Sequence, residues 1–252
     1  MADFKIQSIT PVAGKIKVGG SDVSKIYKGV TLVWPTTFVC SYTFTSTAQL
    51  QTAVDLWTSN RASAISTYGQ INSWCTGAIT DMYGLFNGKT NFNDDISNWD
   101  VSNVTNMKYM FYYAQAFNQD ISAWNVSSVN DMFGMFWYAN AFNQPLNNWN
   151  VSSVTDMSAM FNQGAFNQDL NSWDVSSVTT MNGMFGASGM DGDISAWDVS
   201  SVTNMNGMFN SATVFNQDLT GWCVTNITSE PSSFSTSSAL TSANKPAWGT
   251  CP

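Results

Sequence analysis

The 252-residue chain contains no histidine. Without an imidazole it has no Ser-His or Cys-His catalytic pair and no histidine-ligated metal site, and it lacks the usual side-chain switch near neutral pH. No other pairing of a nucleophile with a base is recognisable in the sequence. We therefore expect a protein that is not an enzyme and that has no cofactor.

Charged residues are also scarce. They make up 10% of the chain, whereas an ordinary domain has about 25%. Hydrophobic residues reach 44% and aromatic residues 14%, which favours a folded chain over a disordered one. The charge is uneven, because residues 1–61 sum to +3 and residues 62–252 to −11. Such an acidic surface repels phosphate backbones, so we expect no nucleic-acid partner.

Long apolar runs are absent as well. No segment has the roughly 20 consecutive apolar residues of a membrane-spanning helix. The N-terminal MADFKIQSIT has no apolar core of the kind found in signal peptides. The sequence therefore predicts neither membrane insertion nor export through the Sec route.

What the chain does have is an internal repeat of 24 or 25 residues. Eleven of the thirteen methionines lie in one column of this repeat, mostly as Met-x-x-Met-Phe. A second column in phase with it consists of Trp74, Trp99, Trp124, Trp149, Trp173, Trp197 and Trp222. A unit this short cannot bury its apolar side alone, so the period predicts a solenoid of about seven stacked units.

The spacing within one unit predicts its local structure. Trp99 and Val101 are two residues apart, as on one face of a short strand. The Met-x-x-Met-Phe motif at 107–111 has the i, i+3, i+4 spacing of one helical turn. We expect each unit to combine a short strand with a one-turn helix, which Thr105 would cap in this unit.

Two of the units, FNQDISAWNVSSVNDMFGMF (117–136) and FNQDLNSWDVSSVTTMNGMF (166–185), resemble the BspA-type bacterial surface protein repeat, a relative of the leucine-rich repeat. The resemblance extends over residues 46–252, since the end of the chain is similar to the closing cap of that family. It implies a leucine-rich-repeat-like right-handed solenoid and a role in surface adhesion or recognition.

Both ends of the repeat region are expected to be capped, because an open stack of units exposes unpaired backbone groups. Before the first unit, Leu50, Val54 and Trp57 have helical spacing. We predict three parts in this region: a linker and N-terminal capping helix in residues 37–70, the solenoid in residues 71–222, and a C-terminal cap in residues 223–252.

Residues 1–36 are basic and contain no repeat. Alternating apolar residues at Phe4/Ile6 and Ile16/Val18, with the hairpin-like KIYKGVTLVWP at 25–35, predict a small β module. The segment is similar to N-terminal modules of tailed-phage structural proteins. That resemblance implies that residues 1–36 attach the protein to other virion proteins. It also implies a virion location, extracellular after lysis, in an oligomer or in many copies.

The four cysteines can pair in three ways. Cys75 and Cys223 occupy the same position in their units, and a bond between them would cross about 29 Å at the spacing of paired strands. A disulfide needs Cα atoms within about 7 Å, and a bond from Cys40 to Cys251 would also span the stack. We therefore expect Cys40–Cys75 and Cys223–Cys251, each joining a cap to its terminal unit; the alternative is free buried thiols.

Polar columns also follow the repeat. We expect the Asn of the Phe-Asn pairs, as in Asn93 and Asn118, to form a hydrogen-bonded ladder between units. Two columns of acidic residues are most simply solvated or bonded to backbone amides at the corners of the stack. The alternative is Ca²⁺ bridging between units, for which the candidate ligands are Asp94, Asp95, Asp191 and Asp193.

Aromatic residues outside the core columns gather in the first three units. At the non-core positions in and just after the Met-x-x-Met-Phe motif, later units have Ser, Asn, Gln, Gly or Ala instead. We call these residues the aromatic patch: Tyr83, Tyr109, Tyr112, Tyr113, Phe133, Trp137 and Tyr138. Clustered exposed aromatic residues mark contact sites, so the patch is the candidate binding surface. The alternative is that it packs on residues 1–45 or on a second copy of the chain.

These patterns favour a non-enzymatic phage virion surface protein, in which residues 1–36 are the anchor and the solenoid is a binding module for host recognition, on a tail fibre or another outer part of the particle. The host partner would be a surface glycan or protein. One alternative is a capsid decoration or cement protein with a structural role. The other is a secreted cell-surface adhesin.

Overall fold

The computed structural model describes the backbone of residues 16–18, 21–23, 26–28 and 31–34 and the whole of residues 39–252. The four short segments form two antiparallel hairpins. They are β1 (Ile16–Val18) with β2 (Ser21–Val23) and β3 (Ile26–Lys28) with β4 (Thr31–Trp34). The hairpin-like 25–35 segment thus contains the β3–β4 pair, whereas Phe4 and Ile6 lie outside the described residues.

Two helices precede the repeats, α1 (Thr47–Ser59) and α2 (Arg61–Tyr68). The Ser46 hydroxyl begins α1 by accepting the amide three residues further on. Asn60 separates the helices with φ −147° and ψ 82°, and its side chain caps α2 in the same way. The side chains whose spacing predicted a helix here, Leu50, Val54 and Trp57, are buried.

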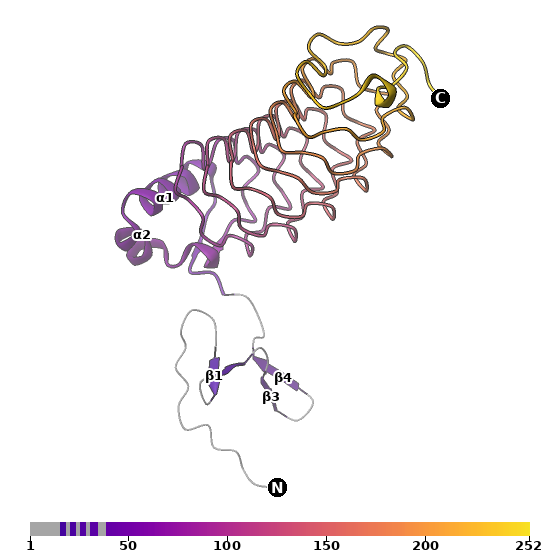
Figure 1. Ribbon diagram of the computed structural model, residues 1–252. Helices are drawn as coiled ribbons and strands as arrows, with labels where there is room; N and C mark the ends of the chain where they lie inside the picture. The colour runs from indigo at the N-terminus through magenta and orange to yellow at the C-terminus, as the bar shows by residue number, and fades with distance from the viewer. Residues whose placement is uncertain (1–15, 19–20, 24–25, 29–30, 35–38) are drawn as a thin grey trace.

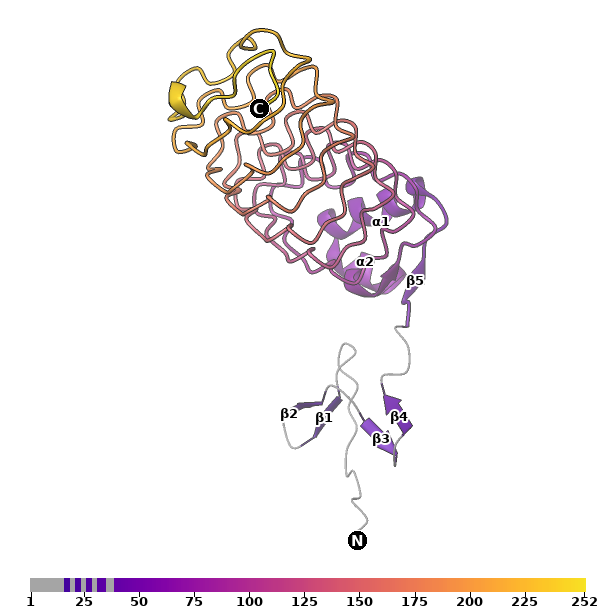
Figure 2. The same ribbon diagram turned by 90° about the vertical axis from the view of Figure 1, so that its right-hand side faces the viewer.

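From Trp74 onward the chain winds in coils that stack on one another (Figure 1, Figure 2). We number them from each repeat tryptophan: coil 1 (74–98), coil 2 (99–123), coil 3 (124–148), coil 4 (149–172), coil 5 (173–196) and coil 6 (197–221). Five parallel bridges join the six coils through Asp81, Asn106, Asp131, Asp156, Thr180 and Asn204. α1 and α2 lie at one end of the stack and the residues after coil 6 at the other (Figure 1).

Short elements extend the stack at its ends. β5 (Tyr42–Thr43) pairs in parallel with β6 (Trp74–Cys75), so the segment before α1 adds a layer to coil 1. The 3-10 helix η1 (Ile71–Ser73) leads into coil 1, and the 3-10 helix η2 (Ser242–Asn244) lies in the C-terminal cap.

The core consists of columns of like side chains. The repeat tryptophans are at most 4% exposed, and every methionine of the Met column is fully buried. From Phe86 to Phe209, the phenylalanine rings of successive coils stack with centroids 5.3–5.8 Å apart. From Trp99 onward, the indole N–H groups of the repeat tryptophans donate to carbonyls 27 or 28 residues earlier in the chain, for example Trp99 to Ile71 at 2.8 Å. Because each large apolar side chain stabilises the fold by about 1.5–3 kcal/mol when fully buried, these columns are the main source of stability.

The Met-x-x-Met-Phe segments are not helical, so the expected one-turn helices are absent from the described coils. In coil 2, the Met110 amide donates to the Met107 carbonyl (3.1 Å) and closes a β-turn in which Tyr109 has φ 58°. A left-handed residue at the third position is typical of a type II turn. A second such turn follows, with Tyr113 at φ 57°. Successive turns leave the same spacing between apolar residues as a helix, and the sequence pattern could not distinguish them.

Stacking explains this difference. Every second amide of the segment donates along the stack, so that Met107, Tyr109 and Phe111 bond to carbonyls of coil 3 at 2.8–3.0 Å. A helix directs its amides to carbonyls four residues earlier in the same segment, and its first four amides have no such partner. Parallel pairing therefore lies at this segment, and residues 99–101 form no strand. Thr105 does not cap a helix either, because its hydroxyl donates to a carbonyl of coil 1 (3.2 Å).

The caps complete the hydrogen bonds that the end coils would otherwise lack. No coil precedes coil 1, and α1 supplies donors in its place: Thr47 and Gln51 donate from their side chains to the carbonyls of Asp81 (2.7 Å) and Leu85 (3.2 Å). At the other end, three amides of coil 6 donate to carbonyls in residues 232–236 at 2.8 Å. Both caps therefore continue the hydrogen bonding of the stack.

The predicted disulfides are confirmed. Cys40 is bonded to Cys75 and Cys223 to Cys251, with Cα atoms 5.4 Å and 4.0 Å apart. The first bond joins the segment before α1 to coil 1, and the second joins the two ends of the C-terminal cap next to coil 6.

Replacing Cys223 and Cys251 together by serine should lower the thermal midpoint. A disulfide between residues 28 positions apart restricts the unfolded chain enough to contribute about 3–4 kcal/mol in the chain-entropy model. Differential scanning calorimetry measures the change, and thiol titration of denatured wild type is the control. We expect no free thiol in the wild type; four free thiols, or an unchanged midpoint in the variant, would contradict the pairing.

Candidate functional site

The aromatic patch forms one connected cluster on coils 1–3, and Tyr109 lies at its centre. The Tyr109 ring centroid is 6.0 Å from that of Tyr83 in coil 1, 5.3 Å from that of Tyr112 in coil 2 and 5.0 Å from that of Phe133 in coil 3. Two of these pairs meet edge to face, an arrangement that ring quadrupoles favour. Tyr83 is 51% exposed, and the other six residues of the patch are half-buried.

The rest of the patch extends from Tyr112. Its ring lies 4.7 Å from Tyr113 and 5.2 Å from Trp137, and Tyr113 stacks on Tyr138 at 4.2 Å. The indole N–H of Trp137 is buried without a hydrogen-bond partner among the described residues. The later coils keep the same buried columns without such rings, so the core does not require them.

Three tyrosines of the patch occupy left-handed backbone positions, with φ 58° at Tyr109, 57° at Tyr113 and 60° at Tyr138. A bulky residue in this conformation costs about 1–2 kcal/mol, which glycine avoids. At the position of Tyr109 the other coils have Gly84, Gly134, Ala159, Gly183 and Gly207. Backbone stability therefore does not explain Tyr109, whereas at the position of Tyr113 and Tyr138 the later coils also have left-handed residues other than glycine, namely Gln163, Ala187 and Ser211. The glycine in most units was a signal in the sequence that could have revealed the left-handed position.

Gly134 leaves the space that the Tyr109 ring occupies. A Cβ atom at Gly134 would lie 2.8 Å from Cε1 and 2.9 Å from Cδ1 of Tyr109. The ring of coil 2 therefore lies directly over the backbone of coil 3, and the patch depends on a small residue beneath it.

Lys108 is the cation of this surface. Its Nζ lies 4.6 Å from the ring centroid of Phe133 and 5.7 Å from that of Tyr109, within the range of cation–π attraction. Burial raises the pKa of the Tyr109 hydroxyl, and the neighbouring tyrosines and the Asp131 and Asp156 carboxylates add to the shift. The surface thus combines rings, one ammonium group and nearby carboxylates.

The segment before the helices does not cover the patch. Of residues 39–45, Tyr42 and Phe44 pack against Tyr68 and against each other, and Phe44 also packs against Trp74. The alternative stated above is that the patch packs on residues 1–45 or on a second copy of the chain. Most of residues 1–38 lie outside the described residues.

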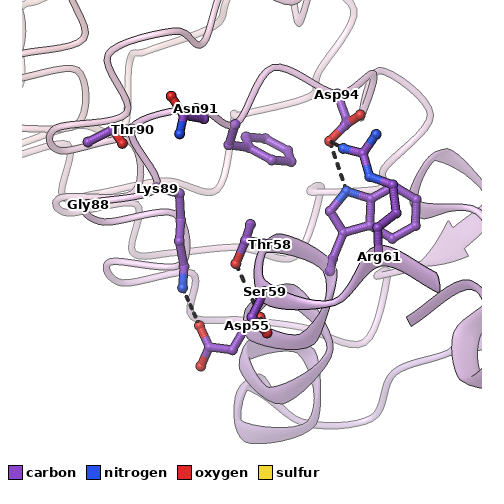
Figure 3. A pocket seen from close by; sticks show the side chains of 11 residues that line it. Asp55, Thr58, Ser59, Arg61, Gly88, Lys89, Thr90, Asn91 and Asp94 are labelled. Atoms are coloured by element: carbon purple, nitrogen blue, oxygen red, sulfur yellow. Dashed lines mark hydrogen bonds and ion pairs between the residues drawn. The ribbon is translucent and has the colours of Figure 1, made fainter. Parts of the chain in front are cut away.

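A pocket of about 690 Å³ lies between α1 and coil 1 (Figure 3). Lys89 pairs with Asp55 at 2.7 Å on one side of it, and Arg61 pairs with Asp94 on the other. The Trp57 indole N–H also donates to Asp94 (2.8 Å). These interactions connect the helices to coil 1, so the charged groups of the pocket hold the N-terminal cap. No sequence pattern indicated this pocket, because its residues come from two separate segments, 55–61 and 88–94, that only the fold brings together.

The four candidate Ca²⁺ ligands all make hydrogen bonds within the protein. Asp94 bonds to Arg61 and Trp57. Asp95, Asp191 and Asp193 accept from backbone or side-chain N–H groups at 2.7–3.2 Å. In the described part of the chain, no three His, Cys, Asp or Glu side chains gather as a metal site would require.

The asparagine ladder is present along one edge of the stack. The Asn118 amide donates to the side-chain oxygen of Asn93 (2.9 Å), and the same bond recurs from Asn143 to Asn118 (3.0 Å). It continues to the C-terminal cap, with Asp191 in the place of one asparagine. These amides have a structural role, as expected.

The family model described as "Mycoplasma protein of unknown function, DUF285" matches residues 40–165 and 146–248. The chain belongs to this family. DUF285 is associated with BspA-like repeat surface proteins, in agreement with the resemblance of the repeat units. No curated protein and no solved structure matches the chain. None of the helices in the described part of this DUF285 chain has the length and apolar character that crossing a bilayer requires.

Replacing Gly134 by alanine should destabilise the protein more than replacing Gly207. Both glycines are left-handed (φ 59° and 62°), so both variants lose about 1–2 kcal/mol. A Cβ at Gly207 meets only Asn210 Cβ at 3.8 Å, whereas one at Gly134 overlaps Tyr109, which adds about 1–3 kcal/mol of overpacking. Urea unfolding measures the free energy of unfolding of both variants. The additional loss in G134A should disappear when Tyr109 is also replaced by glycine, in Y109G/G134A. Equal losses in G134A and G207A would contradict the packing of Tyr109 on Gly134.

Acid should destabilise the protein only below about pH 4. The Thr220 hydroxyl (2.7 Å) and amide (2.9 Å) hold the pKa of Asp218 below its usual value, and hydrogen bonds from serines do the same for Asp120 and Asp198. Because the folded pKa is lower than the unfolded one, the stabilisation is present above about pH 4 and is lost as pH falls through the folded pKa.

Thermal melts by circular dichroism from pH 3 to 8 test this expectation. The midpoint should stay level from about pH 5 to 8, since no histidine titrates there. In addition, T220V should raise the Asp218 pKa measured by NMR toward its usual value. A midpoint that already falls between pH 8 and 5 would count against this account.

Proposed function

We propose that the protein is a non-enzymatic adhesion module of a phage virion, whose aromatic patch contacts a host-surface glycan or protein. The observation that supports this most is the placing of three tyrosines at left-handed positions where other coils have smaller residues. Tyrosine and tryptophan are enriched at the centres of binding interfaces because they offer large, rigid contact areas. Selection for contact explains an arrangement that stability does not.

We further propose that residues 71–222 form a leucine-rich-repeat-like right-handed solenoid that acts as a rigid support. The parallel bridges and the inter-coil hydrogen bonds favour this interpretation. Side chains already held in place lose little conformational entropy on binding, which raises affinity. A rigid stack would therefore present the patch ready for contact.

In this proposal residues 1–36 attach the protein to other virion proteins, in an oligomer or in many copies. The two disulfides favour an oxidising, extracellular setting, such as a particle released by lysis. The two hairpins of this segment would be the attachment module.

A second candidate is a secreted cell-surface adhesin, which the association of DUF285 with surface proteins favours. Immunogold labelling distinguishes these locations. Label on phage tails supports host recognition, label spread over the capsid supports a decoration protein, and label on cells without phage supports the adhesin. The aromatic patch would be the contact surface in the first and third cases.

Replacing Tyr112 and Trp137 together by asparagine should weaken attachment to host cells at least tenfold and shift the thermal midpoint by only a few degrees. Coils 4 and 6 have asparagine at this position, as Asn162 and Asn210, so the residue suits the fold. Loss of two aromatic anchors costs about 2 kcal/mol or more in binding. The measurement is a cell-binding assay with labelled protein, with N210A as the matched control. Unchanged binding and an unchanged oligomeric state would refute the role of the patch.

A further inference from the structure

Lys108 is an exception among the basic residues of the stack and its caps. Residues 39–252 contain four basic residues, and three of them pair with carboxylates: Arg61 with Asp94, Lys89 with Asp55, and Lys245 with Glu230. Lys108 has no carboxylate within ion-pair distance among the described residues, although residues 62–252 sum to −11. The fold does not explain a lysine without a counter-ion in such an acidic chain.

This lysine lies inside the aromatic patch. Its ammonium group is near the rings of Phe133 (4.6 Å) and Tyr109 (5.7 Å), and its side chain is half-buried. A cation–π contact at such a site contributes only about 0.5–1 kcal/mol, whereas a hydrogen bond to a charged group contributes about 1.5–3 kcal/mol. A carboxylate on a ligand would therefore bind Lys108 more strongly than the rings do.

The surroundings favour a saccharide over a peptide. Peptides commonly bind by adding a strand to free backbone groups, but the alternate amides of this segment, those of Met107, Tyr109, Phe111 and Tyr113, already donate to coil 3. What the patch offers instead is ring faces and tyrosine hydroxyls. Ring faces are negative and attract the C–H-rich face of a pyranose, and the hydroxyls both donate and accept hydrogen bonds.

We propose that the aromatic patch binds an acidic saccharide, with the sugar ring on Tyr112 and Trp137 and its carboxylate on Lys108. This inference rests on the proposed binding function and names its ligand class. The Asp131 and Asp156 carboxylates lie close enough to Tyr109 to raise the pKa of its hydroxyl, so they would repel a densely charged polyanion. A single carboxylate per sugar matches a single lysine.

Biolayer interferometry of the full chain on immobilised sialyllactose, galacturonic acid, lactose and heparin tests this proposal. Wild type should bind at least one of the two probes that carry a single carboxylate, sialyllactose or galacturonic acid, at least tenfold more tightly than uncharged lactose or densely sulfated heparin. K108Q should lose that preference, and K108R should keep most of it. K245Q, which makes the same change of charge in the C-terminal cap, is the matched control and should behave as wild type.

Failure of this inference can be separated from failure of the proposed function. If wild type prefers neither single-carboxylate probe, or if K108Q shows the same preference for it as K245Q, the acidic-saccharide proposal is wrong. The patch would still be a binding surface if Y112N/W137N loses attachment to host cells while K108Q does not. If Y112N/W137N attaches normally, the proposed function itself is wrong.

Discussion

The hydrogen bonds between coils are the interaction on which the rest of the structure depends. Alternate amides of each Met-x-x-Met-Phe segment donate to the next coil, for example Tyr109 to Phe133 at 2.9 Å. This pairing holds equivalent residues in line, so the tryptophan, methionine and phenylalanine columns are its direct result. The same pairing is accompanied by successive β-turns within each segment, and these turns contain left-handed residues. The end coils need other donors and acceptors, which α1 and the C-terminal cap supply.

A stack of this kind leaves little freedom for chemistry in its interior. Its backbone groups bond between coils and its apolar side chains fill the columns, so function falls to the outward side chains. In coils 1–3 those side chains form the aromatic patch, and in coils 4–6 the same positions have small or amide residues. The patch includes strained positions such as Tyr109 (φ 58°). The same left-handed conformation recurs outside the patch, for example at Gln163 and Ser211, so it belongs to the turns themselves. What distinguishes coil 2 is a tyrosine at a position where four of the other five coils have glycine.

Some features could be predicted because they follow from period and distance alone. The pairing of Cys40 with Cys75 required only that the other partners were too far away, and the asparagine ladder required only that Asn93 and its equivalents recur in phase. The local conformation at 107–111 was predicted wrongly, since a helical turn and successive β-turns share one spacing. The special position of Lys108 was missed, because it depends on the absence of a nearby carboxylate.

The sequence by itself determined the repeat, the columns that would be buried, the disulfide partners and the residues left over on the outside, since all of these depend on spacing along the chain. The tertiary structure alone decided the direction of the amides, the left-handed tyrosines, the fit of Tyr109 over Gly134 and the rings around Lys108. These depend on which atoms of neighbouring coils meet. A one-dimensional period specifies which residues align between coils but not how their backbones turn to bond with one another.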